Sequence, residues 1–305
     1  MARGISLHVG INRPSSAFPN APILRGCEND ALAMEQIAEG KGFQTRDLLL
    51  GSDATYARVT TKILSAAAQL EAGDIFLFTF AGHGFQVVDV GTGQDELDFL
   101  DEAVLLFDVE LLDDVLRKNM WPRFKAGVRV LMVADSCHSR SVFLIPGDTA
   151  APVANDAVAT EPPPDATPPP PAETDDFPVA TGGNFVPREI PIESGREHQE
   201  EYAEFYRNLL IPIFDPPINA SVLLLSACAS DKRTGDGEQN GMYTAALLKV
   251  LKDPGPPKNY DDLVNAIDVE LKKLGRDQEP QVEVAGVNDE ANDAFRAQRP
   301  FARDE

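Results

Sequence analysis

Two stretches of sequence decide the fold of this chain: Asp74-Ile-Phe-Leu-Phe-Thr-Phe-Ala-Gly-His83-Gly84 and Val128-Arg-Val-Leu-Met-Val-Ala-Asp-Ser-Cys137. Each is an apolar run of strand length, typical of a strand that is buried on both faces of a parallel sheet. The first run leads into a histidine and a glycine, and the second leads into a cysteine. Side chains that follow the carboxyl ends of parallel strands gather at one edge of the sheet. We therefore expect an imidazole and a thiol to meet at that edge.

The segments around these two runs alternate between strand and helix patterns. Such alternation favours an α/β fold in which helices cover both faces of a mostly parallel sheet. The other expected strands cover 5–11, 43–50, 221–228 and 281–287, and the expected helices begin at Asn29 or Asp30, at Asp53, at Tyr243 and at Asp261, with two more over 108–118 and 198–210.

A proline-rich acidic segment divides the chain. Residues 161–171 read Glu-Pro-Pro-Pro-Asp-Ala-Thr-Pro-Pro-Pro-Pro. This composition prevents a helix or a central strand, and it lacks the apolar residues that a core requires. We predict a disordered, partly polyproline linker over 148–197 between a larger portion, 1–147, and a smaller one, 198–305.

Composition excludes several classes of partner. The chain has 305 residues and a formal net charge of −22, which repels nucleic-acid phosphates and anionic lipid headgroups. We therefore expect neither a nucleic-acid nor a membrane partner. No segment reaches the roughly 18 apolar residues of a membrane span, and the first residues lack a signal-like apolar region. Three scattered cysteines imply no disulfide framework. We expect a cytoplasmic protein.

Cys137 differs from the other two cysteines in its surroundings. It follows a strand within a polar Asp-Ser-Cys-His-Ser turn, whereas Cys27 and Cys228 lie in contexts typical of packing. Gly84, next to His83, lets a ligand approach the backbone closely. The histidine directly after Cys137 is a poorer base than His83, because neighbouring side chains in a turn diverge. A thiol nucleophile and its base predict a cysteine peptidase.

Five segments carry a resemblance to a known family: Leu24-Arg-Gly-Cys-Glu-Asn-Asp-Ala31, Phe80-Ala-Gly-His-Gly84, Asp135-Ser-Cys-His-Ser139, Leu225-Ser-Ala-Cys228 and Gly241-Met-Tyr-Thr-Ala-Ala-Leu-Leu. They resemble the metacaspases, caspase-like cysteine peptidases of clan CD (peptidase family C14), and suggest a bacterial member. The resemblance implies a caspase-like fold, a three-layer sandwich with a six-stranded, mostly parallel sheet flanked by helices. Residues 1–147 would form a p20-like catalytic portion, and 198–305 a p10-like portion that completes the same sheet.

The same resemblance implies roles for particular residues. His83 and Cys137 would form the catalytic dyad, and the backbone N–H groups of Gly84 and Cys137 would form the oxyanion hole. Asp30 and Asp135 match two carboxylates of an acidic pocket that binds P1, the residue before the cut bond. The implied substrates are proteins or peptides with exposed arginine or lysine. Two alternatives remain: a caspase-like peptidase of other P1 specificity, and a non-catalytic interaction domain on the same fold.

Calcium is implied as an activator, with no cofactor required for the chemistry itself. Asp98, Asp113 and Asp114 match acidic positions of the calcium-activated members, and carboxylate oxygens suit Ca²⁺. This chain departs from the family pattern after the nucleophile, where Leu144 replaces an aspartate and Arg140 replaces a glycine.

The linker is also the expected site of activation. It lies where the p20-like and p10-like portions are separated in the family, and extended, exposed segments are where proteolysis concentrates. We predict a regulated zymogen that is cut after Arg188 or Arg196, either by itself or by an upstream activating protease. Arg140 is less suitable because it lies too near Cys137 to be presented in cis.

Overall fold

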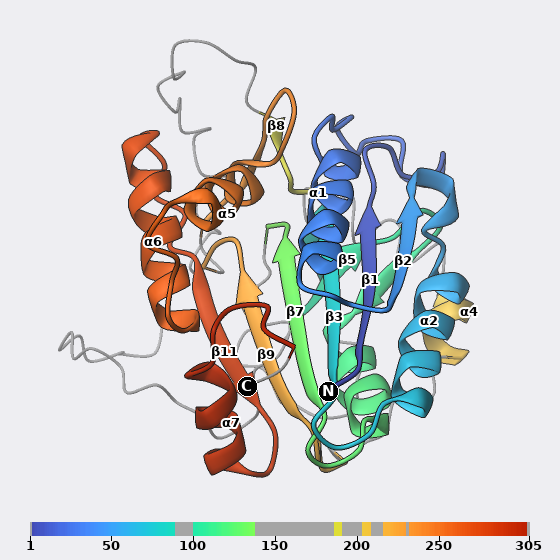
Figure 1. Ribbon diagram of the computed structural model, residues 1–305. Coiled ribbons are helices and arrows are strands. Elements are labelled where there is room, and N and C mark those ends of the chain that lie inside the picture. The colour runs from blue at the N-terminus through green and yellow to red at the C-terminus, as the bar shows by residue number, and fades with distance from the viewer. Residues whose placement is uncertain are drawn as a thin grey trace, which may run out of the picture.

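A central six-stranded sheet forms the middle of the molecule (Figure 1). The computed structural model describes residues 2–88, 100–137, 186–190, 203–208, 216–229 and 232–303. Neighbouring strands of the sheet are parallel except for the last, which is antiparallel to β9. The predicted α/β class with a six-stranded, mostly parallel sheet is confirmed. In spatial order the strands are β11 (Gln281–Ala285), β9 (Ser221–Ser226), β7 (Arg129–Asp135), β3 (Ile75–Ala81), β1 (Gly4–Gly10) and β2 (Thr45–Leu50).

Both faces of the sheet are covered, which explains the apolar runs. In β3, Phe76, Phe78 and Phe80 pack in one core together with residues of α2. Ile75 and Leu77 point to the opposite core, which α1, α5 and α6 complete. Each buried phenylalanine stabilises the fold by about 1.5–3 kcal/mol. The helices are α1 (Cys27–Gly40), α2 (Tyr56–Gln69), α4 (Ala203–Asn208), α5 (Met242–Lys252), α6 (Tyr260–Lys273) and α7 (Asp289–Arg296), with a short turn η1 (Gly51–Asp53).

Two smaller sheets accompany the central one. An antiparallel sheet of three strands adds to the core on the α2 face. The helix predicted over 108–118 is wrong in its first part, because residues 110–112 form a strand of this sheet, and it is right from 113 onward. Helical turns begin only after Leu112, because the apolar residues before that point belong to a buried strand. The remaining elements are β4 (Gly84–Val88), β5 (Leu100–Leu105), β6 (Glu110–Leu112), the paired strands β8 (Val186–Pro187) and β10 (Gly235–Asp236), and the turns η2 (Val115–Met120) and η3 (Trp121–Arg123).

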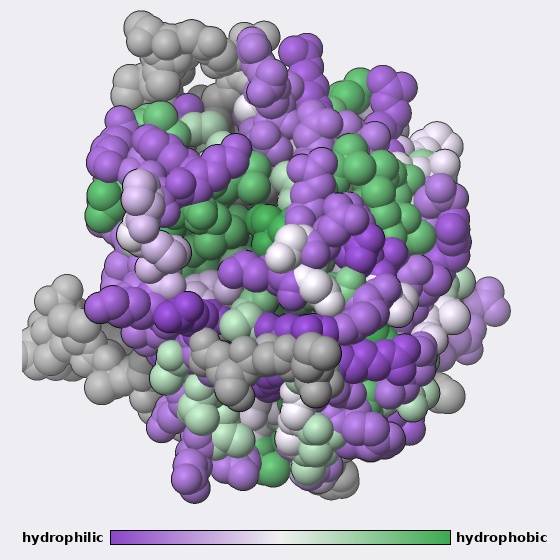
Figure 2. Space-filling model, in the orientation of Figure 1, coloured by the Kyte–Doolittle hydropathy of each residue, from purple (hydrophilic) through white to green (hydrophobic). Residues whose placement is uncertain are grey.

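Most of the predicted linker, 148–197, lies outside the described residues, and its boundaries stay a prediction. The part that is described, 186–190, contains β8, which lies next to the ends of α1 and α5 in Figure 1. Figure 2 shows hydrophilic residues over most of the face that is seen in Figure 1, as expected for a strongly acidic chain. Among the described residues, no helix is long and apolar enough to cross a membrane.

Candidate active site

The carboxyl ends of β3 and β7 bring the predicted catalytic residues together. Ala81 of β3 is in register with Asp135 of β7, so the two strands deliver their next residues side by side. The backbones that follow are in contact, because a Cβ atom at Gly84 would lie 1.9 Å from the carbonyl oxygen of Cys137. Only glycine fits there, which gives the His-Gly pair its steric reason.

His83 is buried, and one of its ring nitrogens is already engaged. Nε2 lies 2.7 Å from the carbonyl oxygen of Pro22, so this nitrogen carries the proton and donates it. Burial lowers the pKa of His83 to about 4, which leaves the imidazole neutral at pH 7. Nδ1 has no hydrogen-bond partner within the described part of the chain. A neutral ring with a free lone pair on Nδ1 is equipped to accept a proton.

The Cys137 thiol is fully buried and uncharged in this state. It donates a hydrogen bond to the carbonyl oxygen of Thr234 at 3.4 Å. A hydrogen bond with the Cys228 thiol, together with burial, raises the pKa of Cys137 well above its usual value. Thiol and imidazole are therefore both neutral at rest, and the sulfur must lose its proton as it attacks.

Arg188 lies inside this site, held by its backbone. β8 pairs with β10, and this pairing continues as the N–H of Arg188 donates to the carbonyl oxygen of Thr234 at 3.2 Å. The carbonyl oxygen of Arg188 accepts from the N–H of Gly84 at 3.0 Å and from the N–H of Cys137 at 3.4 Å. Two backbone donors on one carbonyl oxygen form the arrangement of an oxyanion hole. The chain thus holds Arg188 as a peptidase holds the residue before the bond it cuts.

The side chain of Arg188 is completely buried among three carboxylates. Nη1 lies 3.1 Å from Asp135 Oδ2, whereas Nη2 lies 2.6 Å from Asp30 Oδ2 and 2.9 Å from Asp236 Oδ1. The planar guanidinium suits such simultaneous contacts. The expectation that Arg188 is an accessible loop residue is wrong, because a buried ion-pair network sets its position. Asp30 and Asp135, both predicted to line a pocket, do face the same cation.

Donors from the C-terminal part of the chain hold the two predicted carboxylates. Asp30 Oδ1 accepts from Asn240 Nδ2 at 2.9 Å and from the N–H of Gly241 at 3.1 Å. Asp135 Oδ2 accepts from the N–H of Thr244 at 3.1 Å and from its hydroxyl at 2.7 Å. Thr244 belongs to the first turn of α5, where the helix dipole favours a negative charge. The pocket therefore combines both portions of the chain.

Asp236 is a pocket residue that sequence reasoning missed. Its carboxylate accepts from the N–H of Arg25 at 2.5 Å and of Gly26 at 3.0 Å, immediately before α1 begins. The only local signal is an aspartate between two glycines, shortly before Gly241. That signal was not decisive, because the backbone groups it binds lie 211 and 210 residues away in the sequence.

The pocket as a whole is negative. Burial raises the pKa of Asp30 to about 6, with Asp135 adding to the shift and Arg188 opposing it. Burial alone would lower the pKa of Arg188, but the carboxylates of Asp135, Asp30 and Asp236 outweigh it and hold that pKa well above its usual range. Three carboxylates around one guanidinium leave an excess of negative charge. Such a pocket favours a cationic side chain and repels an acidic one.

The residues implied for calcium do not form an open metal site. Asp113 and Asp114 are buried, and Asp114 pairs with Arg117 Nη2 at 2.5 Å and with Lys118 Nζ at 3.0 Å. Asp98 lies outside the described residues, as do Arg140, Leu144 and Arg196. Across the described ranges, no group of three or more histidine, cysteine or acidic side chains could hold a metal ion. Two cations already neutralise Asp114, so these residues alone do not fit Ca²⁺, and calcium activation stays a prediction.

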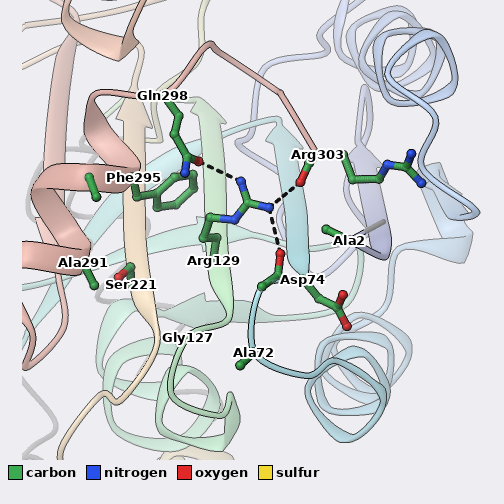
Figure 3. A pocket seen from close by; sticks show the side chains of 12 residues that line it. Ala2, Ala72, Asp74, Gly127, Arg129, Ser221, Ala291, Phe295, Gln298 and Arg303 are labelled. Carbon is green, nitrogen blue, oxygen red and sulfur yellow. Dashed lines mark hydrogen bonds between the residues drawn. The ribbon is translucent and has the colours of Figure 1, made fainter. Parts of the chain in front are cut away.

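A hollow of about 630 Å³ at the opposite end of the sheet has a structural role (Figure 3). It lies where β7 begins, about 20 Å along the strand from its other end at Asp135. Its central side chain, Arg129, donates to Gln298 Oε1 at 2.7 Å and to the carbonyl oxygen of Gly73 at 2.9 Å, and its guanidinium lies over the ring of Phe295. These contacts fasten the C-terminal segment to the sheet.

The comparison with protein families agrees with this geometry. A family model described as the caspase domain of peptidase family C14 matches residues 5–291. The chain belongs to the caspase-domain peptidases. Metacaspase-9 of Arabidopsis thaliana is 25% identical over 331 residues, covering 94% of the chain and 95% of the relative. Metacaspase-8 of the same plant is 28% identical over 142 residues, and the match covers only 36% of that longer relative.

A solved structure has the same fold as this caspase-domain peptidase. The crystal structure of a Geobacter sulfurreducens protein is 31% identical, with a TM-score of 0.74, and the match covers 99% of the chain and all of that protein. The family match and the metacaspase relatives together support a cysteine-type endopeptidase, and the predicted membership of the metacaspase-like peptidases is confirmed.

Proposed function

We propose that this peptidase cuts proteins and peptides after arginine or lysine, using Cys137 as nucleophile and His83 as its proton acceptor. The observation that carries the proposal is the seat of Arg188, whose carbonyl oxygen takes two oxyanion-hole donors while its guanidinium takes three carboxylates. A P1 aspartate would be repelled by those carboxylates, which argues against the caspase-type alternative.

The reaction follows from the positions of these groups. Cys137 Sγ attacks the P1 carbonyl carbon, and its proton passes to Nδ1 of neutral His83. The N–H groups of Gly84 and Cys137 stabilise the oxyanion, and one such donor contributes about 10²–10³-fold in rate. The imidazolium then protonates the leaving amine, and water hydrolyses the acyl-enzyme. Proton transfer of this kind contributes about 10²–10⁴-fold.

The seated linker makes the uncut chain a zymogen in this proposal. Arg188 fills the pocket that a substrate needs, so the bond between Arg188 and Glu189 is the first to be cut, either in cis or by an upstream protease. Once that bond is cut, the chain that ends at Arg188 can leave the pocket. The two fragments stay together because β9 and β11 belong to the same sheet as β7.

Intact-mass analysis tests both parts of the proposal. Wild-type protein should yield fragments 1–188 and 189–305, and the Cys137→Ala protein should stay whole. Arg188→Gln should block this cut, while the matched control Arg196→Gln should not. A fluorogenic panel that varies P1 should then show hydrolysis after arginine and lysine. Preferential hydrolysis after aspartate, or full activity of Cys137→Ala, would refute the proposed function.

A further inference from the structure

The residues that follow Arg188 are also held, on the leaving side of the bond. Glu189 pairs with Arg233, whose Nε lies 2.5 Å from Glu189 Oε2. The next residue, Ile190, is only 3% exposed and packs in the core on the α2 face of the sheet. Its N–H donates to the carbonyl oxygen of Gly84 at 3.3 Å, and Glu189 forms a parallel bridge with Gly84. The chain is therefore fixed on both sides of the bond.

Arg233 is placed by the same segment that binds Arg188. It directly precedes Thr234, whose carbonyl oxygen accepts the N–H of Arg188, and its side chain contacts the residue that follows Arg188. Glu189 is its partner in the described structure, whereas its neighbour Lys232 pairs with Asp277 and Glu279 instead. The Arg233 side chain is 52% exposed and that of Glu189 is 19% exposed, so this is a surface pair at the rim of the site.

The negative charge of the protein makes the position directly after the cut bond selective. A net charge of −22 and three pocket carboxylates work against an acidic residue near the cut bond. Arg233 places a positive charge beside the residue directly after P1. A lysine there would meet a guanidinium at contact distance, and like charges at that distance repel each other.

We propose that Arg233 forms a binding subsite for the residue after the cut bond and selects an acidic side chain there. The apolar seat of Ile190 beside it selects an aliphatic residue at the next position. This inference rests on the proposed function and names its substrate class: chains that read arginine, then glutamate or aspartate, then an aliphatic residue. A partly exposed pair supports a preference of a few-fold for glutamate over glutamine. Glutamate over lysine should reach about tenfold, because attraction then replaces repulsion.

Peptides that differ only after the cut arginine test the subsite. The substrates are Val-Pro-Arg-Glu-Ile, Val-Pro-Arg-Gln-Ile and Val-Pro-Arg-Lys-Ile with identical flanks, and both products are quantified by mass spectrometry. Cut wild-type enzyme should show the highest kcat/KM for the glutamate peptide. Arg233→Glu should invert the order of the glutamate and lysine peptides. The matched control Lys232→Glu adds the same charge one residue away and should keep the wild-type order. Equal rates for all three peptides would overturn the inference while leaving cleavage after arginine intact.

A second measurement does not depend on activity. In the inactive Cys137→Ala chain, hydrogen exchange of the peptide that contains Gly84 reports whether the linker is seated. Arg233→Glu should speed that exchange several-fold, and combining it with Glu189→Arg should restore the slow rate. If no peptide is hydrolysed but this charge swap restores protection, the proposed function fails and the subsite stands. If the double variant exchanges as fast as Arg233→Glu alone, the subsite is refuted.

Discussion

Gly241→Ala should remove cleavage after arginine by filling the space that the guanidinium occupies. A Cβ atom at this position would lie 2.5 Å from Arg188 Cζ, Arg188 Nη2 and Asp135 Oδ2. Ordinary contacts between such atoms are about 3.5–4.0 Å, so the P1 side chain must withdraw by roughly 1 Å. The backbone of Gly241 has φ −59° and ψ 153°, which alanine adopts freely, so the effect is purely steric.

The expected loss is about 10²-fold or more in kcat/KM for arginine substrates. Overpacking of this kind costs about 1–3 kcal/mol, and a displacement of about 1 Å at the reacting carbonyl costs about 10²-fold in rate. The assay is hydrolysis of a fluorogenic arginine peptide. Gly255→Ala is the matched control, because a Cβ atom there meets nothing within 4 Å.

Alkylation of the thiols separates a filled pocket from a damaged fold. With Arg188 displaced, Cys137 becomes accessible, and mass spectrometry of the uncut chains should find it alkylated faster than in the uncut control. Cys27 and Cys228 are also completely buried and serve as internal references, which should react more slowly than Cys137. Arginine hydrolysis within about threefold of the Gly255→Ala protein, with Cys137 still protected, would refute the steric role of Gly241.

Two further predictions concern protons and calcium. Burial raises the pKa of Asp30 to about 6, so the carboxylate is protonated and loses its negative charge below that pH. The value of kcat/KM for arginine substrates should therefore fall by up to tenfold per pH unit below pH 6. This fall should be absent in Asp30→Asn, and a pH profile shared by both proteins would contradict the prediction. Calcium activation through Asp98, Asp113 and Asp114 stays a prediction of the family resemblance, because Ca²⁺ would have to displace Arg117 and Lys118 from Asp114. Calorimetry without heat at millimolar Ca²⁺, together with full activity in chelator, would remove that site.

Sequence reasoning worked where the decisive information is local. The apolar runs of β3 and β7 indicate strands buried on both faces, and the residues just after them, His83 and Cys137, must share an edge because parallel strands end together. It failed at the start of α1. That helix begins at Cys27 rather than after Asn29, because Asn12 Oδ1 accepts the N–H of Cys27 at 2.9 Å and caps the helix from a distant loop.

The same distant cap changes the meaning of Asp30. With the helix already capped by Asn12, Asp30 lies within the first turn and is free to turn its carboxylate toward Arg188. A helix-cap role and a pocket role have the same local sequence signature, an aspartate near a helix start. The resemblance to metacaspases separated the two roles, whereas composition and periodicity did not.

By itself the sequence determined the class of fold, the strand ends and the reactive pair, since hydrophobic period and strand order are written in neighbouring residues. Only the tertiary structure decided the position of Arg188 and the part played by Asp236. Arg188 binds Asp30 across 158 residues of chain, and a linker of acidic and proline residues has no periodicity to show where it docks. The physical reason is that an ion pair forms where the folded sheet brings its charges within 3 Å, and sequence distance sets no limit on that approach.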